Sequence, residues 1–151
     1  MHFNISICIP VYNCANFLKH ALDSILAQSD MQHEIIVYDG GSTDNTPAIM
    51  EQFVRNWSNL RYFRNTQRGG IDADLDKCVS LSKGEYCWLF SGDDVMRPGA
   101  LKKVDELIKS NHDLYICKHT ICNINMKFMY EYPVFKPDIP ALVLPQVHVD
   151  T

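Results

Sequence analysis

The chain has 151 residues, which is enough for one domain with a single sizeable hydrophobic core and too few for two. Hydrophobic residues make up 46% of the sequence and charged residues 21%, a composition typical of globular proteins and not of disordered chains. The formal net charge of −4 gives no overall attraction to nucleic acid, so we expect no nucleic-acid partner.

No apolar run is long enough to span a bilayer, and the opening MHFNISICIP has neither a basic leader nor a cleavable apolar stretch. The six cysteines form no C-x-x-C pair, which favours reduced and mostly buried thiols. We therefore expect a cytoplasmic protein without a transmembrane segment, associated at most peripherally with the inner face of a membrane.

Strand-like and helix-like segments alternate along the chain, which predicts an α/β fold with a mostly parallel sheet. Short apolar runs predict strands, and apolar residues at helical spacing predict helices. In chain order, the expected elements are strand 5–10, helix 17–26, strand 34–38, helix 47–57, strand 60–64, helix 71–82, strand 86–90, helix 98–108 and strand 114–117. Thr46 is the expected N-cap of the second helix, with Pro47 at its first position. Four prolines predict irregular structure over 133–151.

Polar segments follow three of the expected strands, namely 10–13 (PVYN), 39–42 (DGGS) and 91–94 (SGDD). Ligands of open α/β sheets bind at the carboxyl ends of the strands. Because parallel strands bring these ends to one edge, we expect the three segments to line one site.

Asp93 and Asp94 are the candidate metal ligands. Two adjacent carboxylates repel each other, and a divalent cation such as Mg²⁺ or Mn²⁺ would relieve that repulsion while bridging to substrate phosphates. The alternative is a simple turn in which an Asp caps the loop.

Three further residues have a binding interpretation and a structural one. Asp39 could accept a hydrogen bond from a base or ribose, or could be a turn residue. Tyr12 could stack on a nucleobase, or could be a core aromatic. Asn13 could bind the ligand, but the cap of the next helix is the favoured interpretation.

Three motifs in this order resemble those of family 2 glycosyltransferases, from about Ile5 to Leu107: ISICIPVYN, EIIVYDGGSTDNT and KGEYCWLFSGDDVMRPGAL. The resemblance implies the GT-A fold, a Rossmann-like three-layer α/β/α sandwich. It also implies that Asp39 binds the nucleobase and that Asp93, beside Asp94, binds the cation. The segment Arg68–Asp72 is similar to a loop that contacts the nucleotide sugar. The nucleotide-sugar-binding residues implied in this way are Pro10, Tyr12, Asn13, Asp39, Gly41, Gly70, Asp72 and Asp93.

Two positions depart from the family pattern. Many members have a second Asp where this chain has Gly40, and the D-x-D motif, which usually begins with Asp, begins here at Ser91. The Ser91 departure predicts weaker metal binding or another way of holding the diphosphate, whereas the DGGS variant with Gly40 also resembles members of the family.

The resemblance implies transfer of a sugar from a nucleoside-diphosphate sugar to a saccharide or lipid-linked saccharide acceptor, with Mg²⁺ or Mn²⁺, as in bacterial surface polysaccharide synthesis. Residues 1–118 are then the nucleotide-sugar-binding core, and 119–151 begin a truncated or reduced acceptor region. No general base is identified, so the alternative is a non-catalytic nucleotide-sugar-binding domain. The chain lacks the G-x-G-x-x-G and G-x-x-x-x-G-K-[ST] motifs of dinucleotide and P-loop sites.

Overall fold

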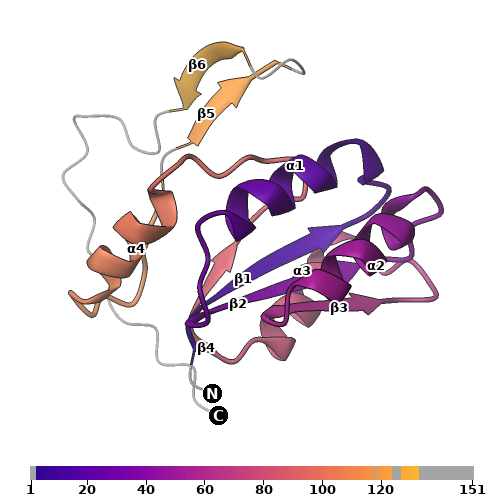
Figure 1. The fold of residues 1–151 in the computed structure, drawn as a ribbon, viewed down its shortest axis with the longest axis horizontal. Coiled ribbons are helices and arrows are strands. Elements are labelled where there is room, and N and C mark those ends of the chain that lie inside the picture. Colours follow the sequence, from indigo (N-terminus) through magenta and orange to yellow (C-terminus); the bar gives the residue numbers. More distant parts are fainter. Residues whose placement is uncertain (1–2, 118, 124–126, 133–151) are drawn as a thin grey trace. The chain divides into compact units, whose positions relative to one another are not determined.

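A computed structural model describes residues 3–117, 119–123 and 127–132 of the chain (Figure 1). The chain divides into two compact units, residues 1–110 and 111–151. In the described part of the first unit, strands and helices alternate as the sequence predicts. Their bounds are β1 Phe3–Val11, α1 Ala15–Leu26, β2 His33–Asp39, α2 Thr46–Asn56, β3 Leu60–Arg64, α3 Ile71–Leu81, β4 Gly84–Leu89 and α4 Ala100–Ile108.

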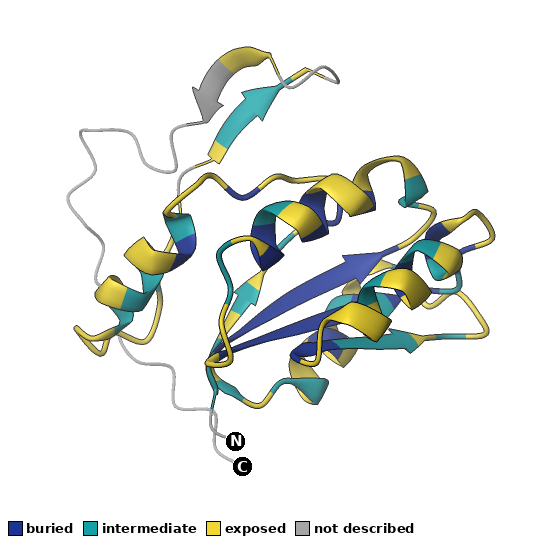
Figure 2. Ribbon diagram, in the orientation of Figure 1, coloured by how far each residue is buried: buried dark blue, intermediate teal, exposed yellow. Residues whose placement is uncertain are grey.

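The strands β1 to β4 form one parallel sheet in the order β3-β2-β1-β4. Ile5 of β1 lies opposite His33 of β2 on one side and Tyr86 of β4 on the other. The central strands are almost fully buried, as Figure 2 shows, which explains their near-continuous apolar sequence. The predicted parallel α/β architecture is therefore confirmed.

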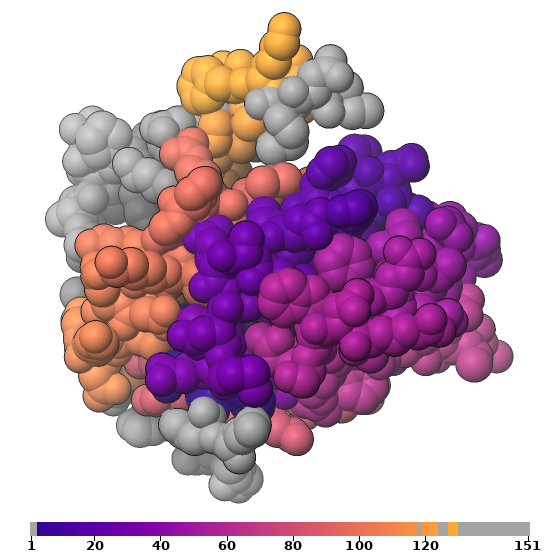
Figure 3. Space-filling model, in the orientation of Figure 1, coloured from indigo at the N-terminus to yellow at the C-terminus, as the bar shows by residue number. Residues whose placement is uncertain are grey.

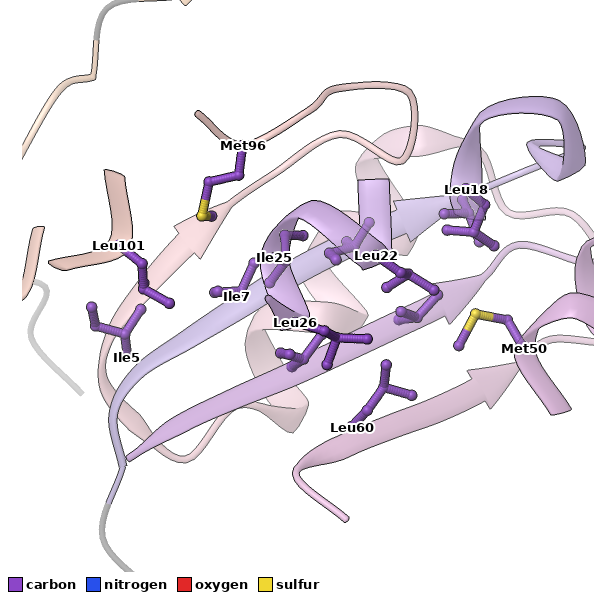
Figure 4. Close-up of a cluster of buried hydrophobic side chains, with 14 residues drawn as sticks. Ile5, Ile7, Leu18, Leu22, Ile25, Leu26, Met50, Leu60, Met96 and Leu101 are labelled. Atoms are coloured by element: carbon purple, nitrogen blue, oxygen red, sulfur yellow. The ribbon is translucent and has the colours of Figure 1, made fainter. Parts of the chain in front are cut away.

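The main core lies between the sheet and the helices α1 and α2. Alternate side chains of β1, from Ile5 to Ile9, face this layer together with Leu22 and Ile25 of α1 and Met50 of α2 (Figure 4). The outer surfaces of α1 and α2 lie side by side in the space-filling view of Figure 3. Burial of these aliphatic side chains is the main stabilising contribution to this unit.

The opposite face of the sheet is covered by α3. Cys8 of β1 and Ile36 of β2 pack there against Cys78 of α3, in a second and smaller buried cluster. Helices therefore cover both faces of the sheet, and the three-layer sandwich is confirmed.

A buried ion pair connects the end of α3 to the sheet. Glu34, which is fully buried, accepts hydrogen bonds from Ser6 Oγ at 2.7 Å, Arg61 at 2.6 Å and the backbone N–H of Lys83 at 2.8 Å. Arg61 also donates to the carbonyl of Leu81, the last residue of α3. Burial alone would raise the pKa of Glu34, but these hydrogen bonds outweigh it and lower the pKa.

The second unit contains an antiparallel pair of strands, β5 His119–Cys122 and β6 Phe128–Tyr132. The strand predicted at 114–117 is wrong, because this segment is irregular and the strand begins at His119. Leu114 and Ile116 are exposed, and no described strand pairs with them. The irregular structure expected over 133–151 lies outside the described residues.

Two smaller predictions are also corrected. Thr46 is the first residue of α2 and not its N-cap, since its hydroxyl accepts the N–H of Cys14 at 3.0 Å instead of capping the helix. The cysteines are not mostly buried: Cys8 and Cys78 are, whereas Cys87 and Cys117 are exposed. All six are free thiols. None of the helices in the described part of the chain has the length and apolarity needed to cross a bilayer.

Candidate functional site

The carboxyl ends of the parallel strands bring the three predicted segments to one edge of the sheet. Val11 ends β1 beside Asp39, which ends β2, and the N–H of Gly40 donates to the carbonyl of Val11 at 2.9 Å. On the other side of β1, the N–H of Phe90, just after β4, donates to Cys8. The loops that follow β1, β2 and β4 therefore start side by side, as the sequence predicts.

A cleft of about 240 Å³ opens at this edge. It is formed by the segment after β1, the first turn of α3 with the loop before it, and the loop after β4. Its lining residues are Pro10, Val11, Tyr12, Cys14, Arg68, Ile71, Asp74, Ser91, Gly92 and Asp93. Pro10, Tyr12 and Asp93 are the predicted nucleotide-sugar-binding residues among them.

Asn13 joins the loops on the β2 side of the cleft. Its backbone N–H donates to Ser42 Oγ at 2.9 Å, and its Oδ1 accepts the N–H groups of Thr43 at 2.8 Å and Asp44 at 3.3 Å. Its φ of 51° lies in the left-handed region, which Asn tolerates better than most residues. The expected helix cap is not formed, because Cys14 occupies the N-cap position of α1. Asn13 instead fixes the shape of the DGGS loop.

Asp39 is completely buried and its carboxylate is already engaged within the protein. Oδ1 accepts the N–H groups of Gly41 at 3.1 Å and Ser42 at 2.6 Å. Oδ2 accepts the hydroxyl of Tyr62 at 2.7 Å and lies 3.6 Å from Arg64 Nε. Burial, followed by this hydrogen bond to Asp39, raises the pKa of Tyr62. Asp39 does not line the cleft, so in this conformation it holds the loop together.

Tyr12 and Arg68 form a stacked pair at the cleft. The guanidinium carbon of Arg68 lies 3.7 Å from the centroid of the Tyr12 ring, within the range of a cation–π interaction. Tyr12 is 36% exposed, so its ring is a surface platform and not a core aromatic. The cleft thus offers an aromatic face beside a positive charge, which suits a planar base next to a phosphate.

The beginning of α3 carries two acidic residues with different surroundings. Asp72 is exposed and does not line the cleft, whereas Asp74 lines the cleft and is only 4% exposed. Burial raises the pKa of Asp74, as does the negative charge of Asp39, while the positive charge of Arg68 opposes both effects. Asp74 was not among the site residues that the sequence pattern predicted. Its spacing of four residues from the buried Cys78 places it on the sheet-facing side of α3, and that spacing was the available signal.

Gly41 and Gly70 lie outside the cleft lining and have backbone roles. Gly41, with φ of 91°, packs on the backbone of the 65–68 segment, and Gly70, with φ of 94°, holds the N-cap position of α3. Both conformations are in the left-handed region, where residues with a Cβ are strained. These glycines therefore shape the loops that border the cleft.

Asp93 is the acidic residue of the loop after β4 that lines the cleft. Ser91 Oγ donates a hydrogen bond to Asp93 Oδ1, and the N–H of Asp94 donates to the carbonyl of Ser91 at 3.3 Å in a tight turn. Gly92 is buried, and a Cβ there would lie 2.7 Å from Val11 Cγ1, so only glycine lets the loop approach β1 this closely. Asp94 is exposed and does not line the cleft.

The cleft is negatively charged where Asp93 lies. Burial first, and then the charges of Asp93 and Asp44, raise the pKa of the Cys14 thiol to about 11. No group of three or more His, Cys, Asp or Glu side chains in the described part of the chain is placed to hold a metal ion. Asp93 nevertheless fits a Mg²⁺ or Mn²⁺ ion that takes its remaining ligands from water and substrate phosphates, which is the usual arrangement for Mg²⁺.

Comparison with known proteins agrees with this arrangement. Residues 6–148 match the family described as Glycosyl transferase family 2. The abequosyltransferase RfbV of Salmonella typhimurium is 34% identical over 125 residues, which cover 80% of this chain and 38% of RfbV. The chain thus spans little more than a third of this relative's length.

Two solved structures share the fold. S. aureus TarS 1–349 in complex with UDP-GlcNAc superposes with a TM-score of 0.68 and 26% identity, over 73% of this chain and 32% of that one. The mannosyltransferase of Pyrobaculum calidifontis in complex with GDP-Man and Mn²⁺ superposes with a TM-score of 0.62 and 22% identity, over 71% of this chain and 32% of that one. The sheet, its cleft and these comparisons together establish that the chain belongs to glycosyl transferase family 2.

Proposed function

We propose that the protein binds a nucleoside-diphosphate sugar in this cleft and serves in transfer of the sugar to an acceptor hydroxyl. The observation that carries the proposal is the placement of the Tyr12–Arg68 pair and of Asp93 in one cleft of a family 2 chain. The TarS structure contains UDP-GlcNAc and supports this class of donor.

The residues of the cleft suit separate parts of such a donor. The Tyr12 ring offers a stacking surface for the base, and Arg68 beside it supplies positive charge for a phosphate. Asp93 would hold a Mg²⁺ or Mn²⁺ ion together with the diphosphate. Asp94, in the same turn, would place a second carboxylate near that ion. The bound ion would supply stabilisation of the negative charge that develops on the leaving diphosphate.

The acceptor is proposed from the family to which the chain belongs and from its named relatives. A saccharide or lipid-linked saccharide acceptor in bacterial surface polysaccharide synthesis agrees with the similarity to RfbV, which is named an abequosyltransferase. Residues 119–151 would begin the acceptor region. A lipid-linked acceptor would bring the protein to the inner face of a membrane by peripheral contact. None of the carboxylates that line the cleft is assigned as the general base.

Calorimetric titration with UDP-, CDP-, GDP- and dTDP-sugars, with and without Mn²⁺, tests the proposal. We expect one class of donor to bind, and Mn²⁺ to tighten its binding at least 10-fold. Asp93→Ala should abolish the Mn²⁺ effect, whereas Asp76→Ala, which removes an exposed carboxylate on the same chain, should leave it intact. An Asp93→Ala variant that keeps the full Mn²⁺ effect would refute the metal assignment.

Transfer is measured separately, as release of nucleoside diphosphate in the presence of saccharide acceptors. Turnover would identify the chain as catalytically competent. Donor binding without transfer to acceptor or to water would instead establish the alternative, a nucleotide-sugar-binding domain that does not catalyse the reaction.

A further inference from the structure

Asp74 is a buried carboxylate that faces the cleft without a hydrogen-bond partner. It is 4% exposed and lines the cleft, and in the described part of the chain its side chain accepts no hydrogen bond and forms no ion pair within 4 Å. The Asp74 oxygens are not among the fully buried unsatisfied atoms of the described residues, so they remain open to a group in the cleft while the protein supplies them no donor. A donor group on a ligand would satisfy them.

Gly40 leaves the space that this carboxylate occupies. A Cβ built on Gly40 would overlap Asp74 Oδ2 and lie 2.9 Å from its Cγ and 3.1 Å from its Oδ1. The absence of a side chain at position 40 therefore lets α3 place a carboxylate directly over the end of β2. In this way α3 supplies an acidic group at the place where position 40 has no side chain.

The contrast with Asp39 decides which acid is available to a ligand. Both oxygens of Asp39 accept hydrogen bonds from the protein, and Asp39 is fully buried away from the cleft. Asp74 has free acceptor capacity and borders the cleft together with Tyr12 and Arg68. A nucleoside stacked on Tyr12 would present its polar edge to the same cleft.

We infer that Asp74 is the specificity-determining acceptor for the donor nucleoside, receiving an N–H of the base or an O–H of the ribose in the space left by Gly40. This inference rests on the proposed function, since it assigns a residue to the same cleft. A carboxylate accepts hydrogen bonds and cannot donate them when ionised, so it selects ligands that present a donor at this point.

The first test compares nucleoside diphosphate affinities of variants by calorimetry in Mn²⁺. UDP, CDP, GDP and dTDP are titrated into the wild type, and the diphosphate that binds most tightly is used as the probe. Losing a charge-assisted hydrogen bond should weaken binding about 10- to 100-fold in Asp74→Ala. Asp74→Asn, which keeps an oxygen acceptor without the charge, should lose less. Asp76→Ala, on the exposed side of the same helix, should bind within about 2-fold of the wild type.

A relocation variant separates the role of the carboxylate from damage to the fold. Gly40→Asp combined with Asp74→Ala returns a carboxylate to the same space from β2, and it should recover part of the affinity lost in Asp74→Ala. Gly40→Ala combined with Asp74→Ala fills the space without the charge and should recover none. Circular dichroism and thermal unfolding of each variant verify that it is folded.

Analogues of the probe distinguish the two sources of the donor group. If the base supplies it, methylation of the base N–H weakens binding to the wild type and not to Asp74→Ala. If the ribose supplies the donor group, the 2′- or 3′-deoxy analogue binds more weakly to the wild type, and Asp74→Ala binds it as well as the unmodified nucleotide. Either result supports the inference.

The outcomes that overturn the inference differ from those that overturn the proposed function. A wild type that binds none of the four diphosphates refutes both. A wild type that binds while a folded Asp74→Ala binds equally well refutes the role of Asp74 alone, and leaves the donor site in place.

Discussion

Single residues at the strand ends decide what the cleft can bind. Tyr12 directly follows β1, its side chain is 36% exposed, and the Arg68 guanidinium lies 3.7 Å from the centroid of its ring. Pro10, Tyr12 and Asp93, which the sequence analysis proposed as binding residues, all line the cleft, and each lies in or within a few residues after an apolar strand run. The sequence could not show that Asp39 already accepts hydrogen bonds from the protein while Asp74 does not. This difference depends on contacts with residues far along the chain, such as Tyr62.

The stacking role of Tyr12 gives a residue-scale prediction. Tyr12→Ala should weaken nucleoside diphosphate binding about 10-fold, since stacking of a base on an aromatic ring contributes about 1–3 kcal/mol. Tyr12→Phe keeps the ring and should bind within about 2-fold of the wild type. Fluorescence competition or calorimetry measures both, and equal losses in the two variants would show that the hydroxyl, not the ring, makes the contact.

At the scale of elements, the sheet was predictable and the loops were not. The strands at residues 5–10 and 34–38 lie within a residue or two of the observed bounds because their apolar runs are buried on both faces, and the less buried edge strand at 60–64 has the predicted bounds. The apolar run at 114–117 was misassigned because apolarity alone does not provide a partner strand. Asn13 and Thr46 were misassigned as caps because their side chains bond across loops instead of within their own helices.

The Glu34 ion pair gives an element-scale prediction about α3 and the sheet. The pKa of Glu34 is lowered in the folded state, so its stabilising contribution is present above the usual pKa of Glu and is lost as the pH falls through its folded-state value. Glu34→Gln should therefore lower the free energy of unfolding at about pH 7 by about 3 kcal/mol, and much less at about pH 3.

Urea unfolding at the two pH values measures this difference. Glu51→Gln serves as the control, because Glu51 is exposed on α2 and its ion pair with Arg55 is long, at 3.9 Å. Exposed pairs of this kind contribute little. A Glu34→Gln variant as stable as Glu51→Gln at about pH 7 would show that the pair does not fasten α3 to the sheet.

For the whole molecule, the parallel sheet and the cleft belong to the same unit. Both hydrophobic clusters and the cleft lie in the unit of residues 1–110. The class of fold was predictable because the order of strands, helices and polar segments is a property of the whole sequence. The acceptor and the general base were not predictable, since within residues 99–117, 119–123 and 127–132 no acidic residue follows a strand of the parallel sheet.

We expect a nucleoside diphosphate and a divalent cation to bind together at the carboxyl edge of this sheet. Paramagnetic broadening by Mn²⁺ in the ¹⁵N spectrum of the nucleotide-saturated protein, with Mg²⁺ as the diamagnetic reference, tests it most directly. We expect the strongest broadening at the amides of residues 91–94, with weaker effects at 11–14. Broadening centred anywhere else in the chain, or the same broadening in Asp93→Ala, would contradict it.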